Sequence, residues 1–398
     1  MAKDYLQYLI LTALNIAVSL LLLFGFVTFL NKVAYAEYGV LWTASTLLLL
    51  LINLGHKDAL FKYTSQNNTT KAASVIGSSL VICFSLTIFF LAFWIVSDNT
   101  LTLALCAATG LQIITILATH YRGRGMYARD VSVILLYRWL WLSMFAFLAL
   151  TLTSVSEISV FWTGIVASIV TFFLMGGRKF FGISEVTFAS VKNALSDPIV
   201  RGFFIIELVT VSFMKVDVLL LRYFDTNYQH LAEYFFSVQV FEAAILMLMP
   251  VTFLFFNRFN QKRDSQSGQS LLKKSALILS IVFSLGLMTW CFLGNFILSN
   301  LFPGYSNAFE TILILTIALL PNAFNALFSA YLIANHKENI FIWVSVLGLL
   351  LLFCINLFAI PAFSIRGAAW ARLISEFGIA VILLTYVIAM LRRSKNNY

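Results

Sequence analysis

The chain has 398 residues, of which 61% are hydrophobic and only 11% are charged, and its formal net charge is +9. Soluble domains average roughly 45–50% apolar and about 25% charged residues, so this composition argues against a soluble protein and for one surrounded mostly by lipid. Basic loops of a membrane protein account for the positive charge, so we expect no nucleic-acid partner.

Long apolar runs predict transmembrane helices, because a helix needs about 20 mostly apolar residues to cross a bilayer. The runs are too long for the alternating segments of about ten residues that build a membrane β-barrel. We predict an all-α integral membrane protein with twelve spans, at about 5–30, 36–55, 72–97, 100–120, 129–152, 157–177, 202–222, 230–256, 272–299, 305–334, 339–361 and 366–391.

The most polar stretch between spans, 178–201, separates six predicted spans from six. We therefore predict two six-helix bundles, at 1–190 and 191–398. Ala36-Glu37-Tyr38 opens the second span and Ala232-Glu233-Tyr234 opens the eighth, which indicates an internal repeat. Because an even number of spans precedes the second bundle, both bundles insert in the same sense. We expect a pseudo-two-fold axis along the membrane normal.

Lysines and arginines predict the orientation, because cytoplasmic loops are rich in them. Of the 26 Lys and Arg residues, only Lys32, Arg222 and Arg366 fall in the loops that follow odd-numbered spans. The other loops and both ends of the chain hold nearly all the rest, so we expect a multi-pass protein with both termini in the cytoplasm. Basic inner loops also predict binding to anionic membrane lipids.

No catalytic, metal or cofactor motif is found in the sequence. Its four cysteines fall inside predicted spans without C-x-x-C spacing, and its four histidines lack metal-ligand spacing. A Walker motif is also absent. We predict a transporter with no catalytic residue, no metal and no cofactor. The rival class is a membrane glycosyltransferase or polysaccharide polymerase, but such enzymes usually need a large external loop that carries catalytic acids.

Ionisable side chains inside spans are costly and usually functional, so they are candidate site residues. Arg138 lies about ten residues into the fifth span, hence about 15 Å deep, beside Trp139 and Trp141. We interpret Arg138, Lys215 and Arg372 as cavity cations that bind an anionic substrate, with Arg138 gripping a phosphate in bidentate fashion. The alternative for Arg138 is burial on an aromatic face with an acidic partner.

Four carboxylates are candidates for ion pairing or for carrying a coupling proton: Glu207, Asp217, Glu242 and Glu376. Arg372 and Glu376 are four residues apart and share a helix face. We expect either an intrahelical ion pair or a pair that opens when an anionic head group competes for Arg372. Lys215 and Arg222 are seven apart and nearly aligned, so they form a basic track unless Arg222 simply snorkels to the interface.

Prolines inside spans are hinge candidates, because proline removes a backbone hydrogen bond and kinks a helix. They are Pro250 and Pro321, and Pro321 is followed by Asn322 and, one turn later, by Asn325. We expect this second segment to bend and to present polar groups to a cavity.

Several segments along the chain carry a resemblance to a known family: AEYG at 36–39, LINLGHKDALFKY at 51–63, MKVDVLLLRYF at 214–224, AEYFFSVQVFEAAILMLMP at 232–250, LFPGYSNAF at 301–309 and IPAFSIRGAAWARLISE at 360–376. Their order resembles the polysaccharide-exporter branch of the multidrug/oligosaccharidyl-lipid/polysaccharide (MOP) flippase superfamily, and most of all bacterial O-antigen translocases.

The resemblance implies a central cavity that opens to each side in turn. It also implies flipping of an undecaprenyl-pyrophosphate-linked oligosaccharide to the outer leaflet of the bacterial cytoplasmic membrane. The expected partners are this lipid-linked oligosaccharide and other membrane proteins of polysaccharide assembly. The alternative is a drug/cation antiporter of the same fold. Such antiporters have acidic positions in the first span, whereas here no acid follows Asp4 and the strongly polar residue is Asn15.

Overall fold

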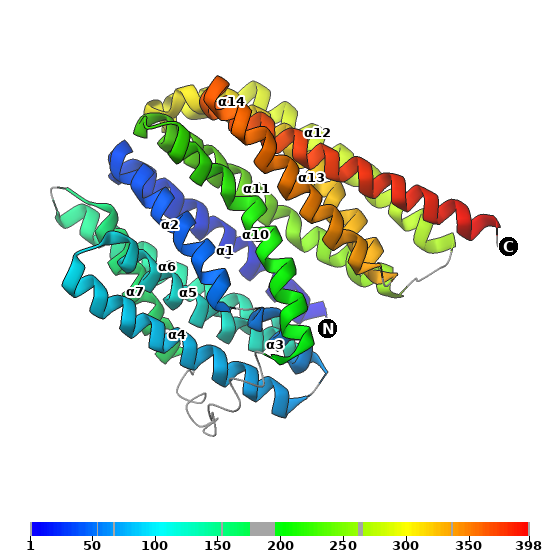
Figure 1. Ribbon diagram of the computed structural model, residues 1–398, viewed down its shortest axis with the longest axis horizontal. Helices are drawn as coiled ribbons and strands as arrows, with labels where there is room; N and C mark the ends of the chain where they lie inside the picture. Colours follow the sequence, from blue (N-terminus) through cyan, green and yellow to red (C-terminus); the bar gives the residue numbers. More distant parts are fainter. Residues whose placement is uncertain are drawn as a thin grey trace. The chain divides into compact units, whose positions relative to one another are not determined.

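The computed structural model describes residues 2–53, 55–66, 68–152, 154–175, 196–261, 266–335 and 337–396. Every regular element within those ranges is a helix, which confirms the predicted all-α class (Figure 1). The chain forms two compact units, Met1–Val211 and Ser212–Tyr398, which we call unit 1 and unit 2. Of the predicted dividing stretch, 178–201, the part from 178 to 195 lies outside the described residues. The bundle limits of 1–190 and 191–398 and their symmetry axis stay predictions.

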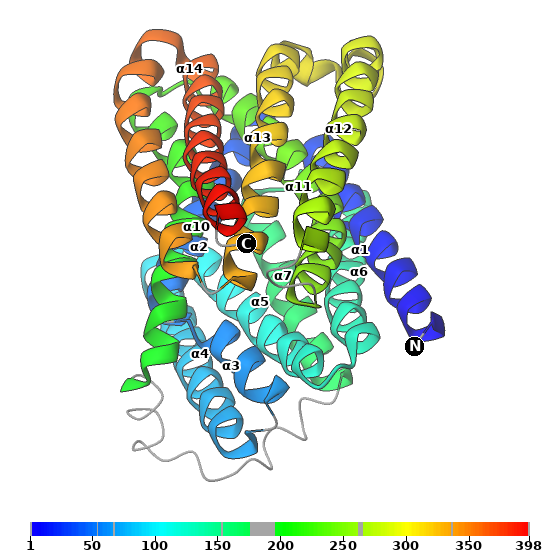
Figure 2. The same ribbon diagram turned by 90° about the vertical axis from the view of Figure 1, so that its right-hand side faces the viewer.

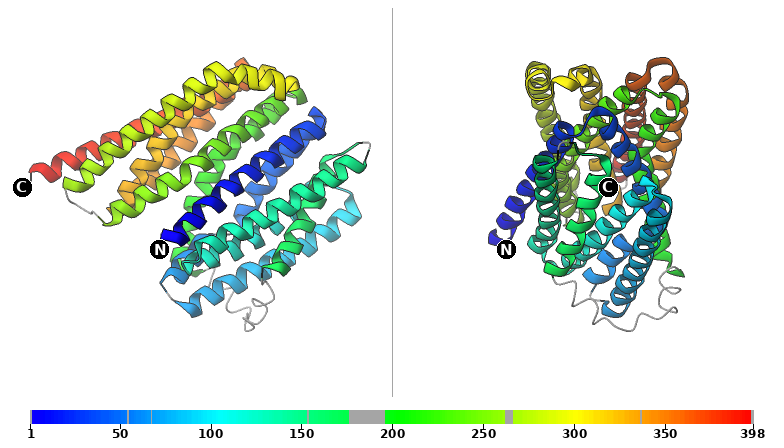
Figure 3. Two further views of the ribbon diagram at one scale, coloured as in Figure 1. Left: turned by 180° about the vertical axis from the view of Figure 1, so that it is seen from behind. Right: turned by 90° about the vertical axis from the view of Figure 1, so that its left-hand side faces the viewer.

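Unit 1 contains α1 (Ala2–Phe29), α2 (Lys32–Asn53), α3 (His56–Ser65), α4 (Thr69–Ser97), α5 (Thr100–Gly123), α6 (Tyr127–Thr151), α7 (Glu157–Leu174) and the first half of α10 (Pro198–Phe224). Helix α5 forms its centre, because it packs against α2, α3, α4, α6 and α7 (Figure 2). Helix α1 lies alongside α6, as the view from behind shows (Figure 3). Apolar side chains that face outward on these helices fit a lipid surrounding.

Unit 2 contains the second half of α10, α11 (Tyr228–Gln261), α12 (Gln266–Leu301), the 3₁₀ turn η1 (Pro303–Ala308), α13 (Phe309–Ala334) and α14 (Glu338–Asn396). Helix α13 is its centre and packs against α11, α12 and α14. Helix α14 turns back on itself, and its two limbs are the predicted eleventh and twelfth spans (Figure 2). When the two limbs of α14 are counted separately, each of the twelve predicted spans corresponds to a helix in the structure.

The break in α14 occurs at Ser364, whose φ of 49° and ψ of −128° leave the helical region. Gly367 is required just after it, because a Cβ there would lie 2.0 Å from the carbonyl oxygen of Ala359. Within the described residues nine segments are long and apolar enough to cross a membrane, and one of them, Asn339–Arg392, holds both limbs. Helix α10 is not among them, because Glu207, Lys215 and Asp217 interrupt it.

Helix α3 is an element that the sequence interpretation missed. The second span was expected to run to about 55 and to be followed by a loop. Instead α2 ends at Asn53, Gly55 adopts φ 77°, and α3 begins at His56. A Cβ on Gly55 would lie 2.4 Å from the backbone nitrogen of Phe204, so glycine lets this corner approach α10. The ten residues of α3 are too polar to register as an apolar run.

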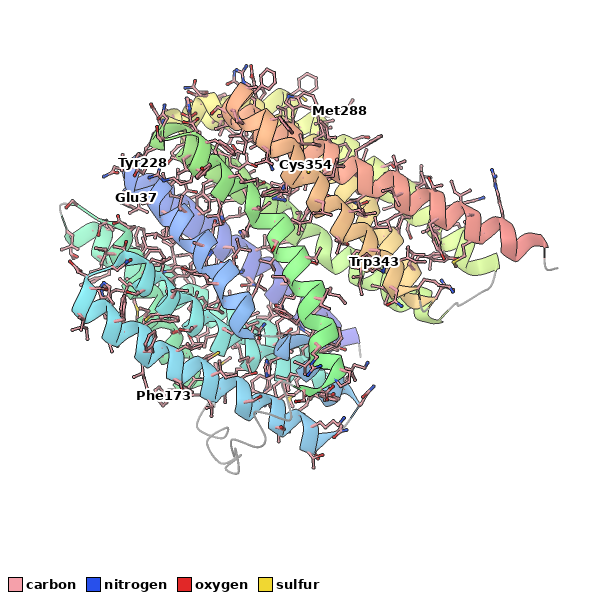
Figure 4. The ribbon with its side chains drawn as sticks, in the orientation of Figure 1. Glu37, Phe173, Tyr228, Met288, Trp343 and Cys354 are labelled. Atoms are coloured by element: carbon pink, nitrogen blue, oxygen red, sulfur yellow. The ribbon has the colours of Figure 1, made fainter. Side chains whose placement is uncertain are left out.

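The predicted repeat occupies equivalent places in the two units. Ala36 is the fifth residue of α2, and Ala232 is the fifth residue of α11. Both alanines are 0% exposed, and the tyrosines two positions later, Tyr38 and Tyr234, are buried as well. Figure 4 places Glu37 near the start of α2 and Tyr228 at the start of α11. Each unit therefore begins its second long helix with the same buried contact surface.

Candidate functional site

A buried ion pair joins α14 to α10 inside unit 2. The Arg372 side chain is 0% exposed, and its Nε and Nη2 donate to Asp217 Oδ2 at 3.2 and 2.9 Å. Nη2 also donates to the Met214 carbonyl at 2.8 Å. The Tyr234 hydroxyl donates to the same carboxylate oxygen at 2.7 Å. Both charged groups thus have a counter-charge and further hydrogen bonds within the protein, which is what a stable ion pair away from water requires.

The guanidinium of Arg372 also lies over two aromatic rings, 5.4 Å from the centroid of Phe213 and 5.5 Å from that of Phe241. A cation in this position is stabilised by the ring quadrupole. The expected intrahelical pair of Arg372 with Glu376 is wrong, because the acid bound by Arg372 is Asp217 of α10. Sharing a helix face made the pair possible, but the neighbouring helix offered the closer carboxylate.

Lys215 has its own partner, Glu242 of α11, with Nζ 2.6 Å from Oε1. Arg222, about two turns further along α10, donates to the Tyr228 hydroxyl at 2.8 Å and lies 4.7 Å from that ring's centroid. The two cations are therefore engaged separately, and the predicted basic track along α10 is wrong. Both cations predicted for substrate binding in unit 2, Lys215 and Arg372, are paired with acids in this conformation.

Glu376 is held by amides instead of by a cation. Its side chain is buried, Asn322 Nδ2 donates to Oε1 at 2.9 Å, and Asn325 Nδ2 donates to Oε2 at 2.8 Å. Among the described residues no Lys, Arg or His lies within 4.0 Å of this carboxylate. The polar groups expected after Pro321 bind Glu376, and their place on a cavity stays a prediction. The α13 helix continues through Pro321, and Pro250 lies within α11, so both hinge assignments stay predictions.

Unit 1 holds its deep arginine differently. Arg138 of α6 donates through Nη1 to Asn15 Oδ1 at 3.0 Å, to the Asn15 carbonyl at 3.4 Å and to the Ser19 hydroxyl. Asn15 and Ser19 are one turn apart on α1. In the ranges that the structure covers, no carboxylate lies within 4.0 Å of Arg138, and Nε and Nη2 make no protein hydrogen bond. The alternative in which an acid pairs with Arg138 is therefore wrong as far as the described residues are concerned.

A small cavity of about 180 Å³ lies beside Glu207, the candidate carboxylate that belongs to unit 1. Asn53 Nδ2 donates to Glu207 at 3.1 Å, and Lys57 Nζ pairs with it at 3.1 Å. Burial lowers the pKa of Lys57, but the charges of Glu207 and Asp58 outweigh burial and leave that pKa raised. Glu207 is therefore an ion-pair carboxylate, which is one of its two predicted roles. The apolar-run interpretation gave no reason to single out Asn53 or Lys57.

The start of α10 is tied to the α3 region by a second carboxylate. Asp197 accepts hydrogen bonds from the Tyr63 hydroxyl and, at 2.8 Å, from the Ile199 amide, and Lys71 Nζ lies 3.7 Å away. Burial raises the pKa of Asp197, but these hydrogen bonds and the lysine outweigh it and hold that pKa below its ordinary value. Tyr63, Lys71 and Asp197 were not singled out in the sequence, since no pattern links residues so far apart.

No family model and no curated protein sequence matches the chain. Solved structures do match it over nearly its whole length. An inward-facing multidrug-resistance MATE-family transporter of the MOP superfamily has a TM-score of 0.67 at 11% identity, over 96% of this chain and 96% of that chain. An outward-facing MATE-family transporter of the same superfamily has a TM-score of 0.65 at 10% identity, over 99% and 96%.

A third match is a MOP-superfamily transporter from Pyrococcus furiosus, whose reversed binding-pocket polarity suggests a different function for that protein. Its TM-score is 0.65 at 12% identity, over 99% of this chain and 96% of that chain. The protein is therefore a multi-pass, all-helical membrane protein. Its fold is the one shared by MOP-superfamily transporters, as the resemblance in the sequence implied at the superfamily level.

Proposed function

We propose that the protein is an alternating-access flippase. It moves an undecaprenyl-pyrophosphate-linked oligosaccharide repeat unit from the inner to the outer leaflet of the bacterial cytoplasmic membrane, for surface polysaccharide synthesis. The observation that carries this proposal is Arg138. It is a cation at membrane depth whose protein partners are a neutral amide and a neutral hydroxyl. Because a charge in that position is costly unless an anion meets it, an anionic substrate group is the natural partner.

The chemistry of the guanidinium agrees with a diphosphate. Arginine presents a planar fork of donors that matches two phosphate oxygens at once. Asn15 and Ser19 occupy only Nη1 and so fix the orientation of the guanidinium. Nε and Nη2 form the edge that a phosphate binds in bidentate fashion. Arg372 and Lys215, by contrast, must first release Asp217 and Glu242 before they can bind substrate.

One cation of this kind is sufficient for transport. Moving an anion outward from a negative cell interior is downhill by about 2.3 kcal/mol per charge per 100 mV. The head group therefore needs a polar path and a modest positive charge, whereas very tight binding would slow its release. The polyprenyl tail stays in lipid while the polar head crosses. Rocking of one bundle against the other exposes the path to each side in turn.

Charge balance in unit 2 supports a coupling proton on Glu376. The candidate residues of unit 2 comprise two cations, Lys215 and Arg372, and three carboxylates. Asp217 and Glu242 each already pair with one of the cations. Among the described residues, the third carboxylate, Glu376, is bound by the amides of Asn322 and Asn325 and by no cation. A buried carboxyl without a cation is most stable in its neutral form. Glu376 is thus the carboxyl that carries a proton, and its release or uptake would accompany the conformational change.

The test is complementation of a deletion strain, read out as surface polysaccharide on the cells and as lipid-linked repeat units in the membrane. We expect deletion to remove the surface polysaccharide and the wild-type gene to restore it. Arg138→Ala should reach normal membrane abundance but restore little polysaccharide. Arg129→Ala, which removes an exposed arginine of the same helix, should restore it fully. Full export with Arg138→Ala would overturn the assigned role of Arg138.

The second candidate is a drug/cation antiporter, which the fold shared with MATE-family multidrug transporters favours. Arg138 opposes it, because its partners among the described residues are neutral and an arginine that no acid neutralises repels a cationic drug. The same deletion strain separates the two functions. A flippase predicts unchanged drug susceptibility with loss of polysaccharide, whereas an antiporter predicts greater drug susceptibility with polysaccharide intact.

A further inference from the structure

A polar cavity of about 520 Å³ lies within unit 2, away from the Arg372 pair. Its polar lining comes from Gln229, His230, Glu233, Asn307, Ser364 and Arg366. These residues belong to the start of α11, to η1 and to the break in α14. The volume falls in the range of about 300–1,000 Å³ that ligand pockets occupy. The positive-inside pattern predicts that this end of the unit faces outward, because α10 runs from the cytoplasm to the α10–α11 turn.

The cavity wall is built around Ser364, which holds a backbone conformation that non-glycine residues rarely adopt. Such a residue persists only where its surroundings hold it, and it is often found at functional sites. The Ser364 hydroxyl donates to Asp225 Oδ2, and His230 Nδ1 lies 2.8 Å from the same oxygen. Asp225 Oδ1 accepts from the Asn227 amide at 2.9 Å. The Asp225 carboxylate thus fixes both the strained serine and the imidazole.

The charge of Asp225 follows from its contacts. Burial raises the pKa of Asp225, but the bonds from Ser364, Asn227 and His230 outweigh burial and leave that pKa lowered. Asp225 therefore remains ionised. Because His230 uses Nδ1 toward Asp225, its Nε2 is the nitrogen that remains for a ligand in the cavity.

The charges around the cavity discriminate between ligand classes. Arg366 is already paired with Glu310 at 2.6 Å, and His230 faces Asp225. Glu233, which is 3% exposed, contributes a carboxylate to the lining, and Arg366 contributes a guanidinium. The positive charge of the lining is therefore balanced by carboxylates, which disfavours a phosphate or another anion. Carboxylate oxygens accept hydrogen bonds from hydroxyl groups, so the wall favours a neutral ligand rich in hydroxyls.

Two amide side chains and one aromatic ring also line the cavity. Gln229 and Asn307 are exposed and each offers a donor and an acceptor on one plane, which suits two adjacent hydroxyls. Phe363 lines the same cavity with its ring 67% exposed, and it offers an apolar surface to the C–H face of a sugar ring. Hydroxyl acceptors, amides and one aromatic face together suit a saccharide.

We propose that this cavity is a saccharide-binding pocket at the outer end of unit 2. It holds neutral sugar units of the head group after they have crossed the membrane, and this role rests on the flippase function proposed above. The pocket is separate from the cation that meets the diphosphate. It therefore gives the protein a way to select head groups by their sugars, with the charge of the substrate sensed elsewhere.

The experiment measures binding of free, neutral oligosaccharides to the full chain in lipid nanodiscs by saturation-transfer NMR. Inorganic pyrophosphate serves as the phosphate probe. We expect at least one neutral disaccharide to bind with a dissociation constant near the millimolar range. The double substitution Gln229→Ala/Asn307→Ala should weaken that binding at least about tenfold. Both side chains are exposed, so folding should be kept, and an unchanged melting temperature checks it. Ser143→Ala, in an apolar groove of unit 1, is the matched control.

The proposal is overturned if no saccharide binds, if the double variant binds as the wild type does, or if pyrophosphate alone competes for the pocket. The flippase function fails through a different result, which is surface polysaccharide that survives deletion of the gene. If deletion removes the polysaccharide and the double variant still restores it in full with every sugar tested, the pocket proposal fails while the function stands.

Discussion

Arg138 in unit 1 and Arg372 in unit 2 are both arginines inside helices that cross the membrane, but their partners differ in charge. Arg372 is fully buried against Asp217 and Tyr234, so its positive charge is cancelled within the protein. Arg138 is bound by Asn15 and Ser19, which fix its position and leave its charge in place. A charge that is neutralised stabilises a fold, whereas one that is positioned without being neutralised is available to a ligand.

The largest effect should come from breaking the neutralised pair of unit 2. Arg372→Met or Asp217→Leu alone leaves one buried charge without its partner, which costs about 3–5 kcal/mol. The double variant removes both charges and should recover at least half of that loss. Thermal unfolding of the purified variants and their abundance in membranes measure the effect. Equal destabilisation by the singles and the double would contradict a neutralising pair.

An exposed pair supplies the control for this experiment. Arg366 and Glu310 lie 2.6 Å apart, but their side chains are 62% and 55% exposed. Surface pairs typically contribute between about 0 and 1 kcal/mol. Glu310→Gln should therefore leave the unfolding temperature nearly unchanged, in contrast to the substitutions at Asp217.

The comparison can be sharpened by making unit 1 resemble unit 2. Asn15→Asp places a carboxylate where Arg138 Nη1 now donates to an amide oxygen at 3.0 Å. We expect the fold to be kept, because a buried cation gains a counter-charge. Export should fall about tenfold or more, since releasing the acid costs the substrate at least about 1.4 kcal/mol. Polysaccharide complementation at matched protein abundance measures it, with Asn15→Ala as the neutral control. Full export by Asn15→Asp would show that the charge of Arg138 need not be free.

A smaller effect on stability is expected from removing Arg138 itself. Arg138→Met leaves only neutral groups behind, and the Ser19 hydroxyl still donates to the Asn15 carbonyl at 2.6 Å. The cost should be about 0.5–1.5 kcal/mol, the usual net contribution of a hydrogen bond. Thermal unfolding should therefore place this variant close to the wild type and well above Arg372→Met. A loss as large as that of Arg372→Met would mean that Arg138 also serves mainly to hold the fold.

The helices could be predicted from the sequence because a membrane span is encoded locally, in about 20 consecutive apolar residues. The deep charges could also be found, because each interrupts such a run. Their partners could not be found, since Arg372 and Asp217 are 155 residues apart and any of several acids fitted the pattern. Helix α3 was missed because it is short and polar, so it contains no apolar run of its own.

The smallest effect concerns one loop carboxylate in each unit, Asp197 in unit 1 and Asp225 in unit 2. Burial raises the pKa of each, but the hydrogen bonds that each accepts outweigh it and leave the pKa below the ordinary value. A carboxyl whose folded-state pKa is lowered stabilises the fold above its unfolded pKa of about 3.9, and that contribution is lost as the pH falls through the folded value.

The unfolding temperature should therefore be level from about pH 7 to pH 5 and decrease below about pH 4. Asp197→Asn and Asp225→Asn should each reduce that decrease, and the double variant should reduce it further. Because Lys71 contributes to Asp197 through an exposed pair, added salt should weaken the effect of Asp197→Asn. If salt leaves the effect of Asp197→Asn unchanged, Lys71 contributes nothing at Asp197.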